Sequence, residues 1–439
     1  MILKHKILLA FILVCCAICL ANGAEQQETL GNFANPSAVK EVLSGKRTVA
    51  NAAWWGFNTT DSTEAIQGAI NSGASKVIIP YVGKDWVVRP IELVSNQEIV
   101  FEPGVVVVAK KGEFKEKRVR LFSALRVSNI TLRGYGATLR MRKADYQSSK
   151  YVKSEWRHAL AIWGSSNVNV LGLRLESSGG DGISVGEKGD VVSKNVLIRD
   201  CICDDNHRQG ISVTSVDKLR IENCVLSNTK GTQPQAGILL EPDTSKGMLV
   251  NVVISNCISE NNVGHGFVTT LSNLDETSRE VSILFVDCYA RNCYAPGLAL
   301  FATKSKSRPK GLVEFRNCVC EDIVSTGAYS YLKVNSPIKL RFSNCKFRNV
   351  ATHRDRIPIV MKLKKANDIS QVGAVEFNNC YVYDEKNRPF LRVPDDEPGE
   401  GRYNIKGNFN VYNPYGARID SGKTDKKLNI KVNYFKTYK

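Results

Sequence analysis

Histidines, acids and arginines recur at matching positions of this chain, and such residues can move protons or bind anions. Three of the five histidines come one to three residues before a short apolar run, and acidic residues precede neighbouring runs. A histidine near a carboxylate can act as a general acid or base close to neutral pH, and arginine can bind a carboxylate through two hydrogen bonds. The candidate catalytic residues are His158, Asp181, His207, Arg208 and Glu241.

These residues suit two reactions on a sugar polymer, of which the first is a β-elimination. In that reaction Arg157 or Arg208 would neutralise a uronate carboxylate and so acidify the C5 proton of the sugar. In the same step His158 or His207 would remove that proton. Arginines and histidines outnumber paired acids among the candidates, so the sequence slightly favours a lyase.

Hydrolysis is the alternative reaction. Asp181 and Glu241 lie two predicted coils apart, which corresponds to about 9.6 Å along a stack of strands. Inverting glycoside hydrolases hold their acid and base carboxyl groups roughly 6.5–9.5 Å apart. The two carboxylates would therefore serve as the acid and the base of an inverting glycosidase.

Aromatic residues recur four positions after the small residue that begins each apolar run. Trp163, Phe301 and Tyr331 share this position with Glu241. Because sugar rings stack on aromatic faces, this column would form a platform for a glycan around the carboxylate. The further candidates for substrate contacts are Arg157, Asp243 and His265.

A pair formed by Asp or Asn and a following Cys divides the chain into repeats of 23 to 35 residues. Apolar residues alternate within the repeats, as in Gly-Ile-Ser-Val at 182–185 and 210–213, which predicts a solenoid of β-strands. The asparagines can form a hydrogen-bonded ladder, and the thiols fit the interior of the coils. Buried thiols in such a ladder are typically unpaired, so we expect few or no disulfides and no metal site. The seven pairs are Asp200-Cys201, Asn223-Cys224, Asn256-Cys257, Asp287-Cys288, Asn317-Cys318, Asn344-Cys345 and Asn379-Cys380.

The N-terminal part of the chain predicts a cap for the end of the stack. Residues 61–70, with Asp61 as N-cap and an apolar face, predict a short helix. This helix, the Ile-Ile-Pro strand at 78–80, the Phe-Glu-Pro-Gly turn at 101–104 and the Gly-Ile-Ser-Val coils resemble those of pectate-lyase-like proteins. The resemblance implies an all-β fold, a right-handed single-stranded parallel β-helix with an N-terminal capping helix. It leaves the activity open, because that family includes hydrolases, lyases, epimerases, phage tailspikes and non-catalytic members.

Individual motifs narrow what the resemblance implies. Residues 154–160, 179–185 and 206–213 resemble a subgroup of secreted bacterial β-helix proteins, which implies that these turns form one shared site. Gly264-His265-Gly266 matches one motif of the polygalacturonases, whereas their other motifs are missing. The Asp-Pro-His of mannuronan epimerases is absent, and the acidic candidates fall on coils too far apart for a tight calcium site.

The first 24 residues predict a secretory signal peptide, because lysines precede an apolar run that ends in small residues. We therefore expect a secreted, periplasmic or cell-surface protein without a transmembrane segment; a lipoprotein modified at Cys16 or Cys19 is the alternative. The polar insertion between residues 140 and 157 is predicted to form a lid or a wall of the site. The other predicted parts are the cap with the first coils (25–110), the parallel β-helix (111–400) and the last coil with a C-terminal cap (401–439).

The chain is basic, with 60 Lys and Arg against 43 Asp and Glu and a formal net charge of +17. A positive surface attracts polyanions, and together with export this favours an anionic polysaccharide as the partner. The absence of a nucleic-acid-binding motif argues against nucleic acid, and no cofactor is expected. A non-catalytic glycan-binding or surface structural β-helix is the remaining alternative. Such a protein would keep the aromatic column but would not need His158 beside Asp181.

Overall fold

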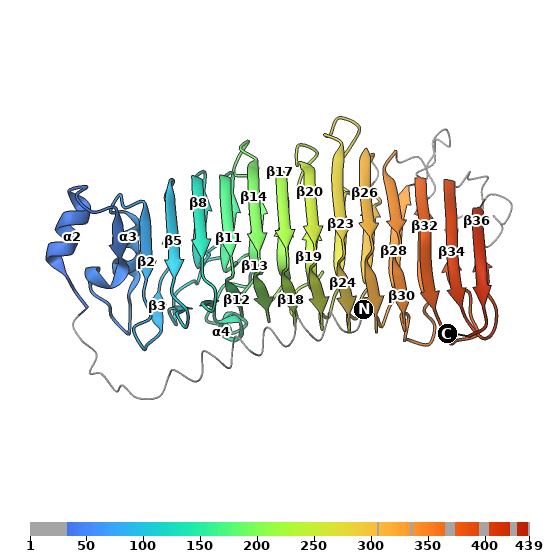
Figure 1. Cartoon of the computed structure of the whole chain (residues 1–439), viewed down its shortest axis with the longest axis horizontal. Coiled ribbons are helices and arrows are strands. Elements are labelled where there is room, and N and C mark those ends of the chain that lie inside the picture. The colour runs from blue at the N-terminus through green and yellow to red at the C-terminus, as the bar shows by residue number, and fades with distance from the viewer. Residues whose placement is uncertain are drawn as a thin grey trace. The chain divides into compact units, whose positions relative to one another are not determined.

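Most coils of the structure contribute three parallel strands, and successive coils stack so that the strands form long columns (Figure 1). Toward the C-terminus, β32 (Ala374–Tyr383) continues through the first two strand positions of its coil. The computed structural model describes residues 33–304, 307–333, 337–364, 374–394, 404–421 and 428–437. The predicted signal peptide at 1–24 lies outside the described residues. Residues 34–439 form one structural unit. The predicted all-β parallel solenoid is confirmed.

The first column consists of long strands at the start of the coil, and the second consists of short strands that follow after one turn. The first column contains β1 (Val49–Asn51), β2 (Lys76–Ile79), β5 (Gln97–Phe101), β8 (Ser128–Arg133), β11 (Ser166–Leu171), β14 (Ser193–Arg199), β17 (Val216–Glu222), β20 (Leu249–Ser255), β23 (Val281–Val286), β26 (Gly311–Arg316), β29 (Lys339–Ser343), β32 (Ala374–Tyr383), β34 (Asn404–Tyr412) and β36 (Asn429–Phe435). The second contains β3 (Trp86–Val88), β6 (Val106–Ala109), β9 (Thr138–Arg140), β12 (Arg174–Glu176), β15 (Ile202–Asp204), β18 (Val225–Ser227), β21 (Ile258–Glu260), β24 (Tyr289–Arg291), β27 (Val319–Glu321) and β30 (Lys346–Arg348).

The third column is a separate parallel sheet, which we call the groove sheet because the candidate site lies on its outer face. Its strands are β4 (Ile91–Glu92), β7 (Phe122–Leu125), β10 (Leu160–Trp163), β13 (Asp181–Gly186), β16 (Gln209–Val213), β19 (Ala236–Leu240), β22 (Phe267–Thr270), β25 (Leu298–Ala302), β28 (Ala328–Lys333), β31 (Ile359–Lys364), β33 (Leu391–Arg392) and β35 (Ile419–Asp420). Leu160, Ile183 and Ile211 occupy one register row and are buried, as the alternation predicts.

Every Asp or Asn of the seven repeat pairs adopts a left-handed backbone, with φ between 53° and 57°. Asn and Asp tolerate this conformation better than other residues with a side chain, which explains their recurrence at the corner of each coil. The predicted ladder forms: the Nδ2 of Asn344 donates to the Oδ1 of Asn317 over 3.2 Å, and Asn379 donates to Asn344 over 3.0 Å. The following cysteines point inward, and the ten described cysteines are buried free thiols.

Helices gather at the N-terminal end of the stack, where α3 (Thr63–Ile70) buries Ala65, Ile66 and Ala69 against the first coils (Figure 1). The N-cap is Ser62 rather than the predicted Asp61, although the Oδ1 of Asp61 accepts a hydrogen bond of 3.0 Å from the Thr63 amide. The remaining helical segments are α2 (Pro36–Leu43), the 3-10 turn η1 (Ala52–Trp55) and α4 (Lys143–Tyr146). Among the described residues, no helix is long and apolar enough to span a membrane.

Candidate active site

A cavity of about 310 Å³ lies on the outer face of the groove sheet, over β10, β13, β16 and β19. It brings together six of the residues singled out in the sequence, from four successive coils and the turns that flank them. We call it the first cavity. These six lining residues are His158, Trp163, Asp181, Arg208, Glu241 and Asp243.

Asp181 lies at the floor of the first cavity, at the start of β13, and is fully buried. Its Oδ2 accepts a hydrogen bond of 2.6 Å from the Oγ of Ser212 and lies 3.2 Å from the Nδ1 of His158. The same Nδ1 lies 3.0 Å from the Asp181 amide nitrogen. One ring nitrogen cannot accept from the amide and donate to the carboxylate at once, so the protonation of His158 decides which bond exists.

The surroundings of Asp181 keep its carboxyl group ionised. Burial alone raises the pKa of Asp181, but the charge and hydrogen bond of His158, the charge of Arg208 and the hydroxyl of Ser212 outweigh it and hold the pKa below its usual value. The Oδ1 of Asp181 has no hydrogen-bond partner among the described residues. A buried anion with an unpaired oxygen is suited to accept a proton from a bound water or sugar hydroxyl.

Arg208 lies between the acidic groups of the cavity. Its two terminal nitrogens are 3.9 Å from the Oδ2 of Asp181 and 3.8 Å from the Oε2 of Glu241, and its Nε is 3.8 Å from the Oε2 of Glu155. These distances are too long for direct hydrogen bonds. The guanidinium therefore acts on all three carboxylates through its charge, and its remaining donors can bind a ligand.

Glu241 differs from Asp181 in the direction in which its pKa is shifted. Burial raises the pKa of Glu241, and nearby Asp243 and Glu155 add to this effect, while Arg208 opposes it only in part. The pKa values of two carboxyl groups in one cavity are thus shifted in opposite directions. The shift favours the neutral acid at Glu241 and the anion at Asp181. Such a difference is the usual basis for assigning one carboxyl as proton donor and the other as acceptor.

Trp163 forms one side of the first cavity, and its face is already occupied. Its Nε1 donates to the Oγ of Ser184 over 3.1 Å, and the guanidinium carbon of Arg120 lies 4.0 Å from the ring centre. The lining also includes Trp156, which belongs to the insertion between residues 140 and 157. The insertion thus contributes to the wall of the cavity. Sequence reasoning missed Trp156 and Ser212, although Ser212 lies two positions after the glycine of its coil and thus faces outward.

Arg157 does not reach the cavity, which corrects the prediction that it contacts substrate. Its side chain is fully buried and donates to the backbone carbonyls of Phe114 (2.7 Å), Lys115 (2.8 Å) and Val152 (2.5 Å). The rings of Tyr146 and Tyr151 lie beside its guanidinium. Arg157 therefore connects the insertion, through Val152, to the loop at 114–115, because it donates to backbone carbonyls of both segments.

His207 also lies outside the cavity lining, contrary to its predicted catalytic position. Its Nε2 is 3.0 Å from the Oγ1 of Thr232, and its Nδ1 is 3.3 Å from the Nε2 of Gln147. Gly231 packs so closely against the ring that an added Cβ would lie 2.1 Å from the Nδ1. Burial lowers the pKa of His207, which favours its neutral ring. The ring connects Gln147 of the insertion with Thr232 of a later turn.

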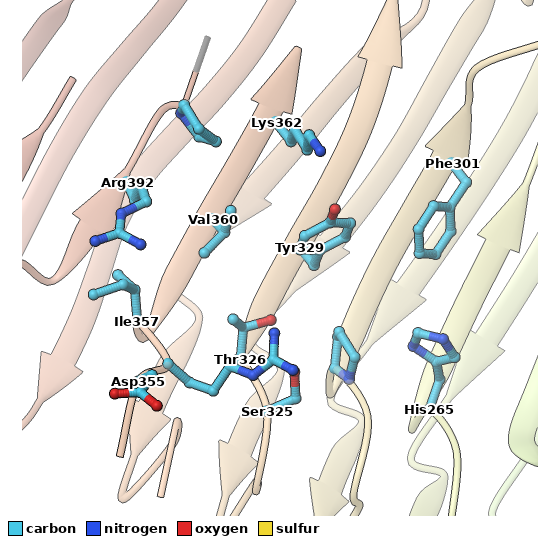
Figure 2. A pocket seen from close by; sticks show the side chains of 13 residues that line it. His265, Phe301, Ser325, Thr326, Tyr329, Asp355, Ile357, Val360, Lys362 and Arg392 are labelled. Carbon is cyan, nitrogen blue, oxygen red and sulfur yellow. The ribbon is translucent and has the colours of Figure 1, made fainter. Parts of the chain in front are cut away.

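The predicted aromatic column is divided between two places. Phe301 and His265 line a second cavity of about 440 Å³ farther along the groove sheet, where their rings meet edge to face at 5.8 Å (Figure 2). Tyr331 is not part of that lining; the Nζ of Lys362 lies 4.5 Å from its ring centre. Trp163 on β10 and Phe301 on β25 are five strands apart, so the aromatics do not surround Glu241 as predicted. Within the described residues, no three His, Cys, Asp or Glu side chains are grouped to hold a metal ion.

Comparison with known proteins agrees with the geometry. Residues 151–347 match the model of the right-handed β-helix region family. The A-module of the Azotobacter vinelandii mannuronan C-5 epimerase AlgE4 superposes with a TM-score of 0.58 at 13% identity, over 88% of this chain and 97% of that chain. The Yersinia enterocolitica family 28 exopolygalacturonase superposes with a TM-score of 0.54 at 13% identity, over 88% of this chain and 78% of that chain.

The fold therefore defines a right-handed parallel β-helix protein of the pectin-lyase-like type, as the resemblance predicted. Carbohydrate-active enzymes share this fold. Among curated proteins, the uncharacterized YclG of Bacillus subtilis is 27% identical over 223 residues, covering 44% of this chain. The matched region covers 38% of YclG, so this chain spans less than half the length of that relative.

Proposed function

We propose that the protein hydrolyses a glycosidic bond of a polysaccharide in the first cavity, with Glu241 as general acid and Asp181 as general base. The proposal depends on one observation. Arg208 lies within 4 Å of two carboxyl groups whose pKa values are shifted in opposite directions. In the proposed reaction Glu241 protonates the leaving glycosidic oxygen, and a water molecule attacks the anomeric carbon while Asp181 takes its proton.

Arg208 would act on both carboxyl groups during this reaction. Its charge keeps Asp181 ionised before the reaction, and it stabilises the carboxylate that forms when Glu241 gives up its proton. Asp181 begins β13, and Glu241 directly follows β19, two coils farther along the stack. Glu241 also lies five residues farther along the strand direction than Asp181, so the long Arg208 contacts, and not the coil spacing, limit the distance between the two carboxyl groups. Two oxygens within 4 Å of the terminal nitrogens of one guanidinium are at most about 10 Å apart, a limit that includes the roughly 6.5–9.5 Å of inverting enzymes. The proposal therefore includes inversion of the anomeric configuration.

The geometry favours hydrolysis over the elimination that the sequence slightly favoured. Of the four arginines and histidines suggested for elimination, only His158 and Arg208 line the cavity. The Nδ1 of His158 is occupied by Asp181, and Arg208 already lies near three carboxyl groups, of which Asp181 and Glu155 would compete with a uronate as anions. We also propose that the reaction takes place outside the cytoplasm, on the basis of the leader-like residues 1–24.

The test is to incubate the protein with uronate-containing and neutral polysaccharides and to follow three signals. These are reducing ends, ultraviolet absorbance of unsaturated uronate, and the anomeric proton of the first product by NMR. Hydrolysis with inversion predicts reducing ends of inverted configuration without ultraviolet absorbance. A rise in absorbance would instead establish elimination, and binding without any product would establish a non-catalytic glycan-binding protein.

Two variants assign the roles, and a third provides a control. Glu241→Gln and Asp181→Asn should each lower kcat by about 10²–10⁴-fold while glycan binding persists, since each removes a proton-transfer group. Glu280→Gln makes the same chemical change at an exposed position outside the cavity and should keep full activity. Full activity of Glu241→Gln would refute the proposed acid.

A further inference from the structure

One row of outward-facing residues connects the first cavity with the second along the groove sheet. Ser184, Ser212 and Leu239 line the first cavity, whereas Tyr329, Val360 and Arg392 line the second. Strand register places all six in a single row that also includes Val268 and Ala299 between the cavities. Figure 2 shows Tyr329, Val360 and Arg392 at equivalent heights on neighbouring strands. The two cavities therefore lie along one continuous row of strand positions.

The row between the cavities is apolar and covered. Leu239, Val268 and Ala299 belong to one cluster, and each is at most 2% exposed. Phe301 packs against this cluster and also lines the second cavity. A ligand that reaches both cavities therefore passes over the side chains that cover this row.

The second cavity differs from the first in charge. Its lining has three cationic side chains, Arg356, Lys362 and Arg392, but only one carboxylate, that of Asp355. Arg392 also pairs with Asp420 over 2.6 Å, while Arg356 forms no ion pair with any described residue. In the first cavity, by contrast, four carboxylates face three cationic side chains. Positive charge is thus concentrated away from the reacting acids.

The second cavity also offers buried hydrogen-bonding atoms. The Nδ1 of His265 and the Oγ1 of Thr326 are buried and have no partner among the described residues. Burial lowers the pKa of His265 to about 4, so its ring is neutral at ordinary pH and adds no charge. Buried polar atoms are nearly always paired in native proteins, so these two call for a polar ligand. Figure 2 shows His265 and Thr326 on the same side of the cavity, opposite Lys362.

We propose that the second cavity binds the anionic group of an acidic sugar, a carboxylate or a sulfate ester, while the scissile bond of the same polysaccharide lies in the first cavity. Glu241 and Lys362 occupy one register row, four strands apart. Four strand spacings amount to about 19 Å, so the ligand spans about four sugar residues. The inference rests on the proposed function in taking the ligand to be a glycan whose scissile bond lies in the first cavity, whereas binding of the anionic group in the second cavity does not require the reaction.

The test compares the double variant Lys362→Gln/Arg356→Gln with the wild type in calorimetric binding to an oligogalacturonate of about six residues. Loss of two charges from the cavity should raise the Kd about tenfold or more. The fully methyl-esterified oligomer has the same backbone without charge, and its Kd should not change. A sulfated oligosaccharide of equal length distinguishes sulfate recognition from carboxylate recognition. The charge-matched control Lys194→Gln/Arg279→Gln alters exposed residues outside both cavities and should bind like the wild type.

The outcomes separate this inference from the proposed reaction. If the double variant loses affinity for the charged oligomers while no variant or wild-type sample releases product, the anionic subsite stands and the hydrolase proposal fails. If hydrolysis depends on Glu241 but the double variant binds every oligomer as the wild type does, the subsite is refuted. Equal loss of affinity for the charged and the methyl-esterified oligomer would also refute it, because charge would then have no part in recognition.

Discussion

The Oγ of Ser212 donates a hydrogen bond of 2.6 Å to the Oδ2 of Asp181, although the two residues belong to neighbouring coils. Asp181 pairs in register with Gln209, three residues before Ser212, so its carboxylate leans along the strands toward the middle of the groove. Parallel stacking makes this contact possible, because strands of neighbouring coils lie side by side. The serine therefore helps to set both the position and the ionisation of the proposed base.

Ser212→Ala should shift the acid limb of the activity profile to higher pH. The hydroxyl stabilises the ionised form of Asp181, whose pKa is lowered in the folded protein. Activity that needs the anion is lost as the pH falls through this pKa, and removal of the hydrogen bond raises the pKa. The shift should be about one pH unit, because such a bond to a charged group contributes roughly 1.5 kcal/mol. The measurement is kcat/KM against pH.

Ser184→Ala provides the matched control for this experiment. Ser184 lines the same cavity one coil earlier and accepts its hydrogen bond from Trp163 instead of contacting Asp181. Its loss should leave the acid limb in place. An unshifted profile in Ser212→Ala, or an equal shift in both variants, would contradict the assignment of Asp181 as the base.

Arg157→Met should loosen the insertion, because three backbone carbonyls lose their donor. The free energy of unfolding should fall by about 3 kcal/mol, since a hydrogen bond to a charged group contributes roughly 1.5–3 kcal/mol. Thermal unfolding measures the stability, and limited proteolysis at Lys150 and Lys153 should become faster. Arg142→Met is the control, because Arg142 donates to one carbonyl only, that of Ala109. Similar losses in the two variants would argue against a special role of Arg157.

Asn317 should tolerate glycine better than alanine. Its side chain takes part in two ladder bonds, with Asp287 (3.1 Å) and Asn344 (3.2 Å), and its φ is 54°. Asn317→Gly loses the ladder bonds at a cost of about 1 kcal/mol. Asn317→Ala also places a Cβ in a left-handed conformation, which adds about 1 kcal/mol. Chemical denaturation should rank wild type above Gly above Ala, and equal stabilities of the two variants would show that the backbone conformation has no influence.

The sequence by itself determined the fold and much of the groove. Strand alternation is local, so the side chains of Ile183 and Ile211 had to face inward, and Ser212 and Trp163 outward, once the coils were aligned on their small residues. The Asp or Asn of each repeat specifies a left-handed corner in the same local way. Asp181, Arg208 and Glu241 hold different positions in their repeats, but they belong to successive coils whose groove strands stack side by side, so the sequence could group them on one face, and all three line the first cavity.

Only the tertiary structure decided the direction of side chains in the turns. Arg157 and His207 stand directly beside His158 and Arg208, which line the first cavity, yet their own side chains bond elsewhere. Arg157 donates to carbonyls of the loop at 114–115 and of Val152, and His207 contacts Gln147 and Thr232. Turn residues have no strand alternation to fix their orientation, so distant packing determines it. Phe301 and Trp163 are strand residues and do share one outward column, but only the structure showed that this column crosses two separate cavities.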